Sequence, residues 1–443
     1  MNYRLKDINL LTWRKVINII KNIQVNVTSL DLSCNDLDNK TGAELAEAFA
    51  AIPATVTSLN LRETSLGNKT GAELAEAFAA IPATVTSLNL YRNKLGNKTC
   101  AELTQALAAI PTTVTSLNLF YNSLGNKTGA ELAEAFRAIR ATLTSLSLSG
   151  NDLGKKTGSE LAQLLAAIPV TVNFLDLSDN GLANKTGAEL AEAFAAIPAT
   201  VTTLNLSNNL LDSKTGAELV QALAAIPATV TALNLSNNLL DNKTRAELAV
   251  AFAAIPASVT SLNLSGNDLG NKTGAELAEA FAAIPATVTS LNLSGNDLGF
   301  KKGAELAVAF AAIPATVSAL DLSGNQLQNL SVESIKQLIN KLPNLQTIYL
   351  GEAEIKAMNL TKRAALKAVL SNIPDIILLN NQGNVLGTNP EAQHFFAGRL
   401  GITQSIPSLL SYAAFYVQDN PKIGAEQKAE ALNEDVQDFI NFF

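Results

Sequence analysis

The sequence predicts an α/β solenoid, a curved array with parallel β-strands on its concave face, α-helices on its convex face and helical caps at its ends. Two observations carry this prediction. A similar segment recurs every 29 residues, and a period of that length is typical of solenoids. Each copy contains one strand pattern and one helix pattern, and neither can bury its apolar side alone, so the copies must stack. The copies start at Val27, Val56, Val85, Val114, Leu143, Val172, Val201, Val230, Val259, Val288 and Val317.

Each copy begins with a strand. Leu30 and Leu32 alternate with polar residues, which is the period of a strand with one buried face. A turn centred on Asn35 follows, and its carboxamide can bond backbone groups that the turn leaves unpaired. Because this Asn recurs in most copies, we expect an internal hydrogen-bonded ladder. In the diverged copy that starts at Leu345, we expect Ala353 at the ladder position.

A helix comes next in each copy. Thr41 and Glu44 have the spacing of a capping box at a helix N-terminus. Leu45, Phe49 and Ile52 then form an apolar stripe at i, i+4 and i+7. Parallel strands lie about 4.8 Å apart, whereas packed helices need roughly 8–10 Å, so the helix side must be the longer arc.

The pattern LxxLxLxxNxL followed by a helix resembles the leucine-rich repeat, and the 29-residue helical form is similar to the ribonuclease-inhibitor subclass. The resemblance covers roughly residues 26–386. The near-identical copies also resemble leucine-rich repeat effectors of intracellular bacterial pathogens, which enter host cells through a type IV secretion system. An acidic run before a hydrophobic C-terminus is similar to the Glu-rich translocation signals of such proteins; it contains Glu426, Glu430, Glu434, Asp435 and Asp438.

The repeats define the expected domain organisation: a helical cap at 1–26, the repeat array at 27–387 and a C-terminal helical cap at 388–443. Val16, Ile20 and Ile23 lie one period before the apolar stripe of the first full copy, so the N-terminal cap is expected to be a half repeat. Trp13 is expected to cover the open end of the core.

Composition excludes several classes of protein. No apolar run approaches the roughly 20 residues of a membrane span, and charged residues interrupt the first 25 residues, so we expect neither a span nor a secretory signal. Two cysteines, Cys34 and Cys100, lie at different places in their copies, which favours a reducing compartment over a disulfide. The net charge of −7 and the absence of a basic stripe argue against nucleic-acid binding.

A group of substitutions interrupts the uniform inner face in copies two to four. Positions that are Ser, Gly, Asn or Asp in most copies carry aromatic and charged residues there, and stacked strands would place them side by side. Aromatic and Arg side chains are enriched at interface hot spots. The predicted partner-binding residues are Arg62, Glu63, Tyr91, Arg92, Lys94, Phe120 and Tyr121, with Phe174, Asp176 and Asp179 in copy six as a further part of the same surface.

No catalytic constellation or metal site is found in the sequence. His394 is the only histidine and lies far along the chain from Cys100, and no CxxC or paired-histidine spacing occurs. We therefore predict a non-enzymatic scaffold, expected to be a monomer with no cofactor, that binds a host protein or another effector in the host cytoplasm. The alternative is a GTPase-activating or other enzyme-regulating repeat protein, to which Arg62 or Arg92 would contribute.

Overall fold

The computed structural model describes residues 1–140, 142–339, 342, 344–370, 373–383 and 385–386. His394, the acidic C-terminal run and the predicted cap at 388–443 lie outside the described residues. Contacts within the chain divide it into two compact units, here called unit one (Met1–Asn238 with Ala254–Val259) and unit two (Leu239–Ala253 with Thr260 onward). The division into an array with two caps remains a prediction.

The strands are short, and within each unit every strand pairs in parallel with the next. Unit one holds β1 to β9 and unit two holds β10 to β14, each in sequence order. The strands are β1 (Asn2–Arg4), β2 (Ser29–Asp31), β3 (Ser58–Asn60), β4 (Ser87–Asn89), β5 (Ser116–Asn118), β6 (Ser145–Ser147), β7 (Phe174–Asp176), β8 (Thr203–Asn205), β9 (Ala232–Asn234), β10 (Ser261–Asn263), β11 (Ser290–Asn292), β12 (Ala319–Asp321), β13 (Thr347–Gly351) and β14 (Asp375–Leu379).

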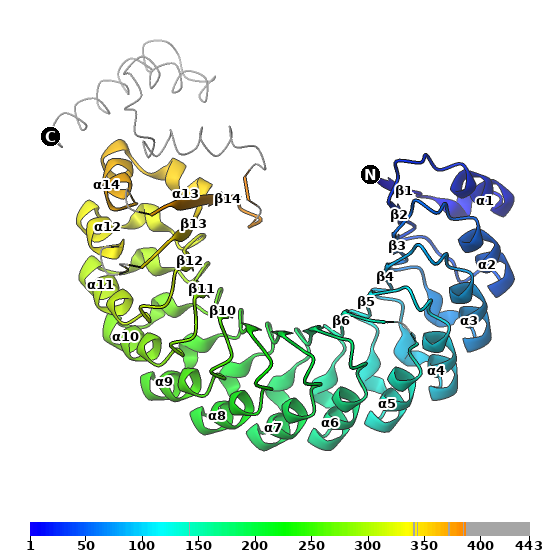
Figure 1. Ribbon diagram of the computed structural model, residues 1–443, viewed down its shortest axis with the longest axis horizontal. Coiled ribbons are helices and arrows are strands. Elements are labelled where there is room, and N and C mark those ends of the chain that lie inside the picture. The colour runs from blue at the N-terminus through cyan, green and yellow to red at the C-terminus, as the bar shows by residue number, and fades with distance from the viewer. Residues whose placement is uncertain (141, 340–341, 343, 371–372, 384, 387–443) are drawn as a thin grey trace, which may run out of the picture. The chain divides into compact units, whose positions relative to one another are not determined.

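A helix follows almost every strand. The α-helices are α1 (Trp13–Lys21), α2 (Gly42–Ala50), α3 (Gly71–Ala79), α4 (Cys100–Ala108), α5 (Gly129–Arg137), α6 (Gly158–Ala166), α7 (Gly187–Ala195), α8 (Gly216–Ala224), α9 (Arg245–Ala253), α10 (Gly274–Ala282), α11 (Gly303–Ala311), α12 (Val332–Ile339), α13 (Glu352–Ala357) and α14 (Leu360–Leu370). Most copies also contain one turn of 3-10 helix between strand and helix. Within unit one the strands line the concave side and the helices lie on the convex side, as predicted (Figure 1).

The apolar residues of each copy form the core between strand and helix. Leu30 of β2, Leu32 just after it, Leu45 and Phe49 of α2, and Ile52 just after that helix are all at most 4 % exposed, which confirms the predicted inward faces. The same positions are buried in the following copies. Stacking therefore gives one continuous core in each unit.

The predicted asparagine ladder is present beneath the turns. Asn122 is fully buried, and its Nδ2 donates to the carbonyls of Leu90 and Phe120 at 2.9 and 3.2 Å. Its Oδ1 accepts from the backbone N–H groups of Asn93 and Leu95 at 3.1 and 3.2 Å. Each ladder side chain thus satisfies buried backbone groups of its own copy and of the preceding one.

The prediction of Ala353 at the ladder position is wrong. Glu354 takes that place, and its carboxylate accepts from the N–H groups of Gly324 at 2.9 Å and Leu327 at 3.1 Å. Burial raises the pKa of this carboxyl even though several backbone N–H groups bond it. The longer side chain reaches the turn from one residue further along, which a position-by-position comparison of copies misses.

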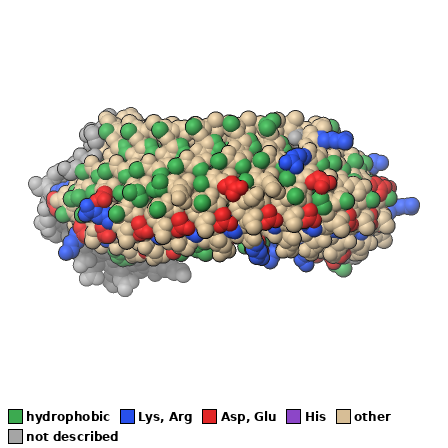
Figure 2. Space-filling model, turned by 90° about the horizontal axis from the view of Figure 1, so that it is seen from below, with side chains coloured by type: hydrophobic (Ala, Val, Ile, Leu, Met, Phe, Trp, Pro, Cys, Tyr) green, Lys and Arg blue, Asp and Glu red, His purple; other side chains and the backbone are tan. Residues whose placement is uncertain are grey.

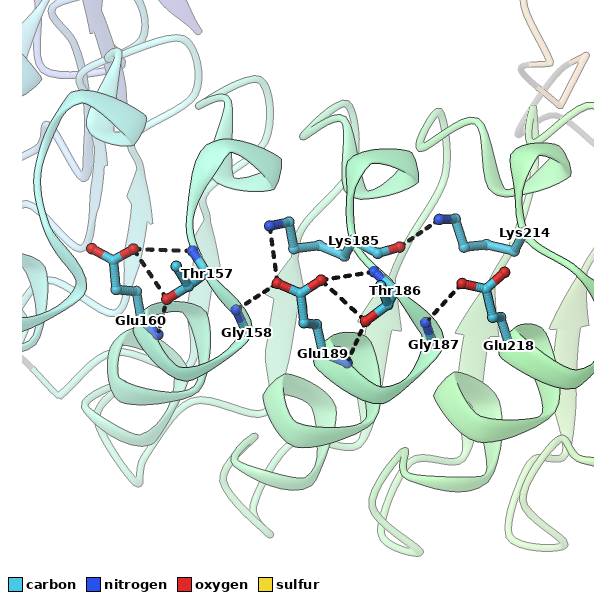
Figure 3. Close-up of polar contacts among 9 residues, drawn as sticks. All are labelled: Thr157, Gly158, Glu160, Lys185, Thr186, Gly187, Glu189, Lys214 and Glu218. Carbon is cyan, nitrogen blue, oxygen red and sulfur yellow. Dashed lines mark hydrogen bonds and ion pairs between the residues drawn. The ribbon is translucent and has the colours of Figure 1, made fainter.

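A second ladder joins the helix N-termini (Figure 3). Thr186 caps α7, and one carboxylate oxygen of Glu189 accepts from the Thr186 N–H at 2.9 Å, as predicted for a capping box. The other oxygen accepts from the N–H of Gly158 in the preceding helix at 3.1 Å and from Lys185 Nζ at 3.3 Å. These bonds lower the pKa of Glu189 to about 2, chiefly through the Thr186 backbone. The capping carboxylate therefore links neighbouring copies as well as ending its own helix.

The N-terminal segment contains the expected helix and an unexpected strand. In α1, Val16 and Ile20 are buried, and the indole N–H of Trp13 donates to the carbonyl of Glu44 at 3.0 Å. β1 pairs with β2, although it precedes the first full copy and lacks the repeat pattern from which the other strands were predicted. On the helix side, acidic side chains recur along the surface with basic ones among them (Figure 2). None of the described helices is long and apolar enough to cross a membrane.

Candidate protein-interaction surface

The turn after each strand in unit one holds a residue in the left-handed region. In copies two to four this position is occupied by Glu63, Arg92 and Tyr121, with φ of 53°, 59° and 53°. The equivalent residue is glycine in several other copies, for example Gly150 with φ of 64°. A side chain with a Cβ atom costs about 1–2 kcal/mol in this conformation. Three successive copies therefore keep bulky side chains where the backbone favours glycine.

These turns place three aromatic rings in contact on the inner face of unit one. The Tyr91 and Phe120 rings are stacked, with centroids 4.8 Å apart. Tyr121 contacts Phe120 at 4.6 Å and Tyr91 edge-on at 6.0 Å. The Arg62 guanidinium lies 4.6 Å from the centroid of the Tyr91 ring, at cation–π distance. The four side chains form one continuous row that crosses copies two to four.

Glu63 forms ion pairs with both arginines of this row. Its Oε1 accepts from Arg92 at 2.9 Å and lies 3.5 Å from Arg62 Nη2, while its Oε2 accepts from the Cys34 thiol at 3.4 Å. The Arg92 hydrogen bond holds the pKa of the Glu63 carboxyl below its usual range. The carboxylate therefore stays ionised and bonds both guanidinium groups, of which Arg62 also lies over the Tyr91 ring.

Lys94 lies two residues beyond Arg92, also with positive φ, and its side chain is exposed. The turn thus carries two cations in adjacent left-handed positions. No ion pair within the described part of the chain involves the Lys94 ammonium group. Lys94 completes what we call the aromatic–cation patch, which consists of Arg62, Glu63, Tyr91, Arg92, Lys94, Phe120 and Tyr121.

The residues predicted in copy six divide into two groups. Asp179 joins the aromatic–cation patch, because its Oδ2 accepts from the Tyr121 hydroxyl at 3.0 Å. Asp176 instead bonds Ser147 at 2.9 Å and Asn205 at 2.8 Å, so it belongs to the polar rows of the sheet. Phe174 is half-buried on β7, and the ring contacts of the described residues do not connect it to the aromatic row.

Two residues that position the patch were not predicted from the sequence. Gly150 lies under the rings, since a Cβ there would come within 2.4 Å of Phe120 Cε2 and 2.9 Å of Tyr121 Cδ2. Cys34 bonds Glu63 from the first copy. Gly266, Gly295 and Gly324 occupy the position of Gly150 in other copies, so nothing in the sequence sets Gly150 apart from them.

Other chemistry-bearing groups do not assemble into a site in the described residues. No three His, Cys, Asp or Glu side chains come together there as ligands for a metal ion. Both cysteines are free. Cys100 begins α4, and its sulfur lies 3.5 Å from Glu134 Oε2 of α5. Burial raises the pKa of this thiol. A raised pKa disfavours the reactive thiolate.

Comparison with known proteins agrees with this architecture. The family model described as Leucine Rich repeat matches residues 25–46, 141–162, 256–278 and 285–299. The crystal structure of the leucine-rich repeat-containing protein LegL7 from Legionella pneumophila is 43 % identical in sequence, with a TM-score of 0.62, over 69 % of this chain and 96 % of that chain. The chain belongs to the leucine-rich repeat family.

A second solved structure, the complex of Rad7 and Elc1 in yeast, is 15 % identical over 76 % of this chain and 86 % of that chain, with a TM-score of 0.38. No curated protein matches the sequence significantly. Leucine-rich repeat proteins are generally protein-interaction scaffolds, and the inner face of unit one is the surface on which this chain differs most from copy to copy.

Proposed function

We propose that this leucine-rich repeat protein is a non-enzymatic scaffold that binds one protein partner through the aromatic–cation patch, with Asp179 at its edge. The observation that carries the proposal is the row of large side chains held in left-handed turns of successive copies. The other copies show that the fold accepts Gly, Asn or Asp at this position, so stability does not require Glu63, Arg92 or Tyr121.

The composition of the row supports a contact surface. Tyr and Arg are the residues most enriched among interface hot spots, and rings that are already packed lose little side-chain freedom on binding. The Tyr91–Phe120 stack, the Arg62 contact and the bonds of Glu63 hold the row in one arrangement before a partner arrives. Phe174 and Asp176 lie further along the same face and would extend the footprint.

The proposed setting is the cytoplasm of a host cell, reached by type IV secretion. The similarity to a Legionella pneumophila leucine-rich repeat protein and the acidic C-terminal run support it. A fusion to an enzyme reporter that is active only in host cytosol tests this, delivered by a Legionella strain with the secretion system and by one without it. Equal signal from both strains would contradict the proposal.

The binding test compares the wild type with the triple variant Tyr91→Ser, Arg92→Gly and Phe120→Ser, which gives these positions the residues common in other copies. Each protein is used to recover partners from host lysate, and a photo-crosslinking residue is placed at position 120 in one sample and at Ser290 of unit two in another. We expect a protein that is crosslinked from position 120 only and that the triple variant fails to recover. Equal recovery by wild type and variant, with both folded by circular dichroism, would refute the proposed site.

A further inference from the structure

The aromatic–cation patch is more positive than the chain that carries it. Arg62, Arg92 and Lys94 supply three positive charges, and Glu63 and Asp179 supply two negative charges, a balance of +1 in a chain whose net charge is −7. The cations are also accessible, since the Arg62 and Arg92 side chains are 45 % and 60 % exposed. The three cationic side chains therefore lie in two neighbouring copies, Arg62 in copy two and Arg92 and Lys94 in copy three.

The internal hydrogen bonds leave donors at this place unused. Glu63 engages one nitrogen of Arg92 and one nitrogen of Arg62, and its second oxygen accepts from Cys34. A guanidinium group has five N–H donors in a fixed planar arrangement that matches a carboxylate. One carboxylate shared by two guanidiniums and a thiol cannot satisfy them. Lys94 adds three more donors in the same turn as Arg92.

The patch also has a direction along the array. The cations lie in copies two and three, the aromatic rings in copies three and four, and Asp179 accepts from Tyr121 at the copy-six end. At about 4.8 Å per strand, copies two to six span roughly 19 Å, which an extended segment of about six residues would cover. A partner that follows this order places acceptors over the cations and an apolar side chain over the rings.

We infer that the partner presents an acidic polypeptide segment, whose carboxylates contact Arg62, Arg92 and Lys94 and whose neighbouring apolar or aromatic side chain packs on Tyr91, Phe120 and Tyr121. This inference rests on the proposed function and specifies the chemistry of its partner. A nucleic acid would also offer anions and flat bases, but it carries a phosphate at every nucleotide and would meet Glu63 and Asp179 inside the same patch.

The test uses defined probes and the full-length protein. Fluorescence anisotropy measures the binding of a labelled random copolymer of glutamate and tyrosine, a copolymer of lysine and tyrosine, and a single-stranded oligothymidylate. Lys94→Asp reverses one charge at a position where Asp152 and Asp268 have the same left-handed backbone, so the fold accommodates it. Lys21→Asp, an exposed site on α1, makes the same change in net charge away from the patch.

We expect the glutamate copolymer to bind best, Lys94→Asp to weaken it about tenfold or more, and Lys21→Asp to change it less than about twofold. Raising the salt concentration from about 50 to about 300 mM should weaken this binding, because exposed charges are then screened. Preference for the lysine copolymer or the oligothymidylate, equal effects of the two substitutions, or no binding of the glutamate copolymer would each overturn the inference.

The results that would contradict the proposed function differ from those that would contradict the acidic-segment inference. If the triple variant of Tyr91, Arg92 and Phe120 loses a cellular partner but the glutamate copolymer is not preferred, the patch binds a protein of other chemistry. If the triple variant retains every cellular partner while the copolymer still binds the wild type, the copolymer result reports the chemistry of the patch alone and the proposed function is wrong.

Discussion

Two adjacent residues, Tyr121 and Asn122, have different roles: Tyr121 belongs to the aromatic–cation patch and Asn122 to the scaffold. Tyr121 points onto the inner face and is 45 % exposed, whereas Asn122 is fully buried in the ladder. We predict that Tyr121→Gly lowers the free energy of unfolding only slightly and weakens partner binding. Asn122→Ala should strongly destabilise the protein.

The magnitudes follow from the contacts of each side chain. Tyr121→Gly removes aromatic contacts with Phe120 and Tyr91, each worth about 0.5–1.5 kcal/mol, and one exposed hydrogen bond to Asp179, but it relieves about 1–2 kcal/mol of left-handed backbone cost. These terms partly offset one another, so the net loss should be about 1 kcal/mol and stay below about 2 kcal/mol. Asn122→Ala leaves the buried N–H groups of Asn93 and Leu95 without their acceptor, at about 1–3 kcal/mol each. We expect a loss of about 3 kcal/mol or more.

The assay is urea unfolding followed by far-UV circular dichroism, with hydrogen exchange at the amides of Asn93 and Leu95 as the local measurement. Asn126→Ala, an exposed asparagine of the following 3-10 turn, is the control for a generic Asn-to-Ala change. The free energy of unfolding should fall by less than about 2 kcal/mol in Tyr121→Gly and by more than about 1 kcal/mol in Asn122→Ala. A result outside either limit would refute the assignment of Tyr121 to the patch and Asn122 to the scaffold.

Three further predictions concern the capping ladder and the rings. Lys302 replaces the usual capping Thr of α11 and has no acceptor atom, so Lys302→Thr should stabilise the protein by about 1 kcal/mol in urea unfolding, and Thr273→Lys should cost about the same. The lowered pKa of Glu189 means that its carboxylate stabilises the fold above about pH 4.5, and that this contribution is lost as the pH falls toward about 2. The free energy of unfolding of Glu189→Gln should therefore depend less steeply on pH in that window than that of the wild type. An unchanged slope would count against the ladder. Gly150→Asn should displace the Phe120 and Tyr121 rings and reduce the near-UV circular dichroism signal. Gly295→Asn should not, because a Cβ at Gly295 has the same backbone conformation but would come no closer than 3.8 Å to its nearest neighbour, the Gly266 nitrogen.

The scaffold could be predicted from the sequence because it repeats. Leu30, Phe49 and Asn35 recur in register, so strand, helix and ladder positions can be assigned from spacing alone, and the structure confirms them. Local exceptions could not be predicted in this way. β1 precedes the first full copy and lacks the repeat pattern. Glu354 reaches the ladder from a shifted position through its longer side chain.

The candidate surface was predictable only as a set of positions. The columns of the repeat predicted that Arg62, Tyr91 and Phe120 lie side by side, but not that Glu63 would bond both arginines or that Tyr121 would reach Asp179 across two copies. Those contacts depend on side-chain length and rotamer, which spacing does not encode. The role of Gly150 depends on the rings of the preceding copy, so it can be recognised only when neighbouring turns are placed in space.

The left-handed turns explain why the patch can change independently of the fold. The copies that start at Val27 to Val317 each contribute one such turn. Its backbone bonds run to the next copy whatever side chain it carries: the N–H of Glu63 donates to Tyr91, that of Arg92 to Phe120 and that of Gly150 to Ser178. Side chains at this position can therefore be replaced without altering the sheet or the ladder. Because the backbone favours glycine there, a bulky residue is retained against a local cost. Three such residues occur in succession, Glu63 bonds Arg92, and Tyr121 packs on the Tyr91 and Phe120 rings. Selection for a common contact explains this arrangement better than independent drift does.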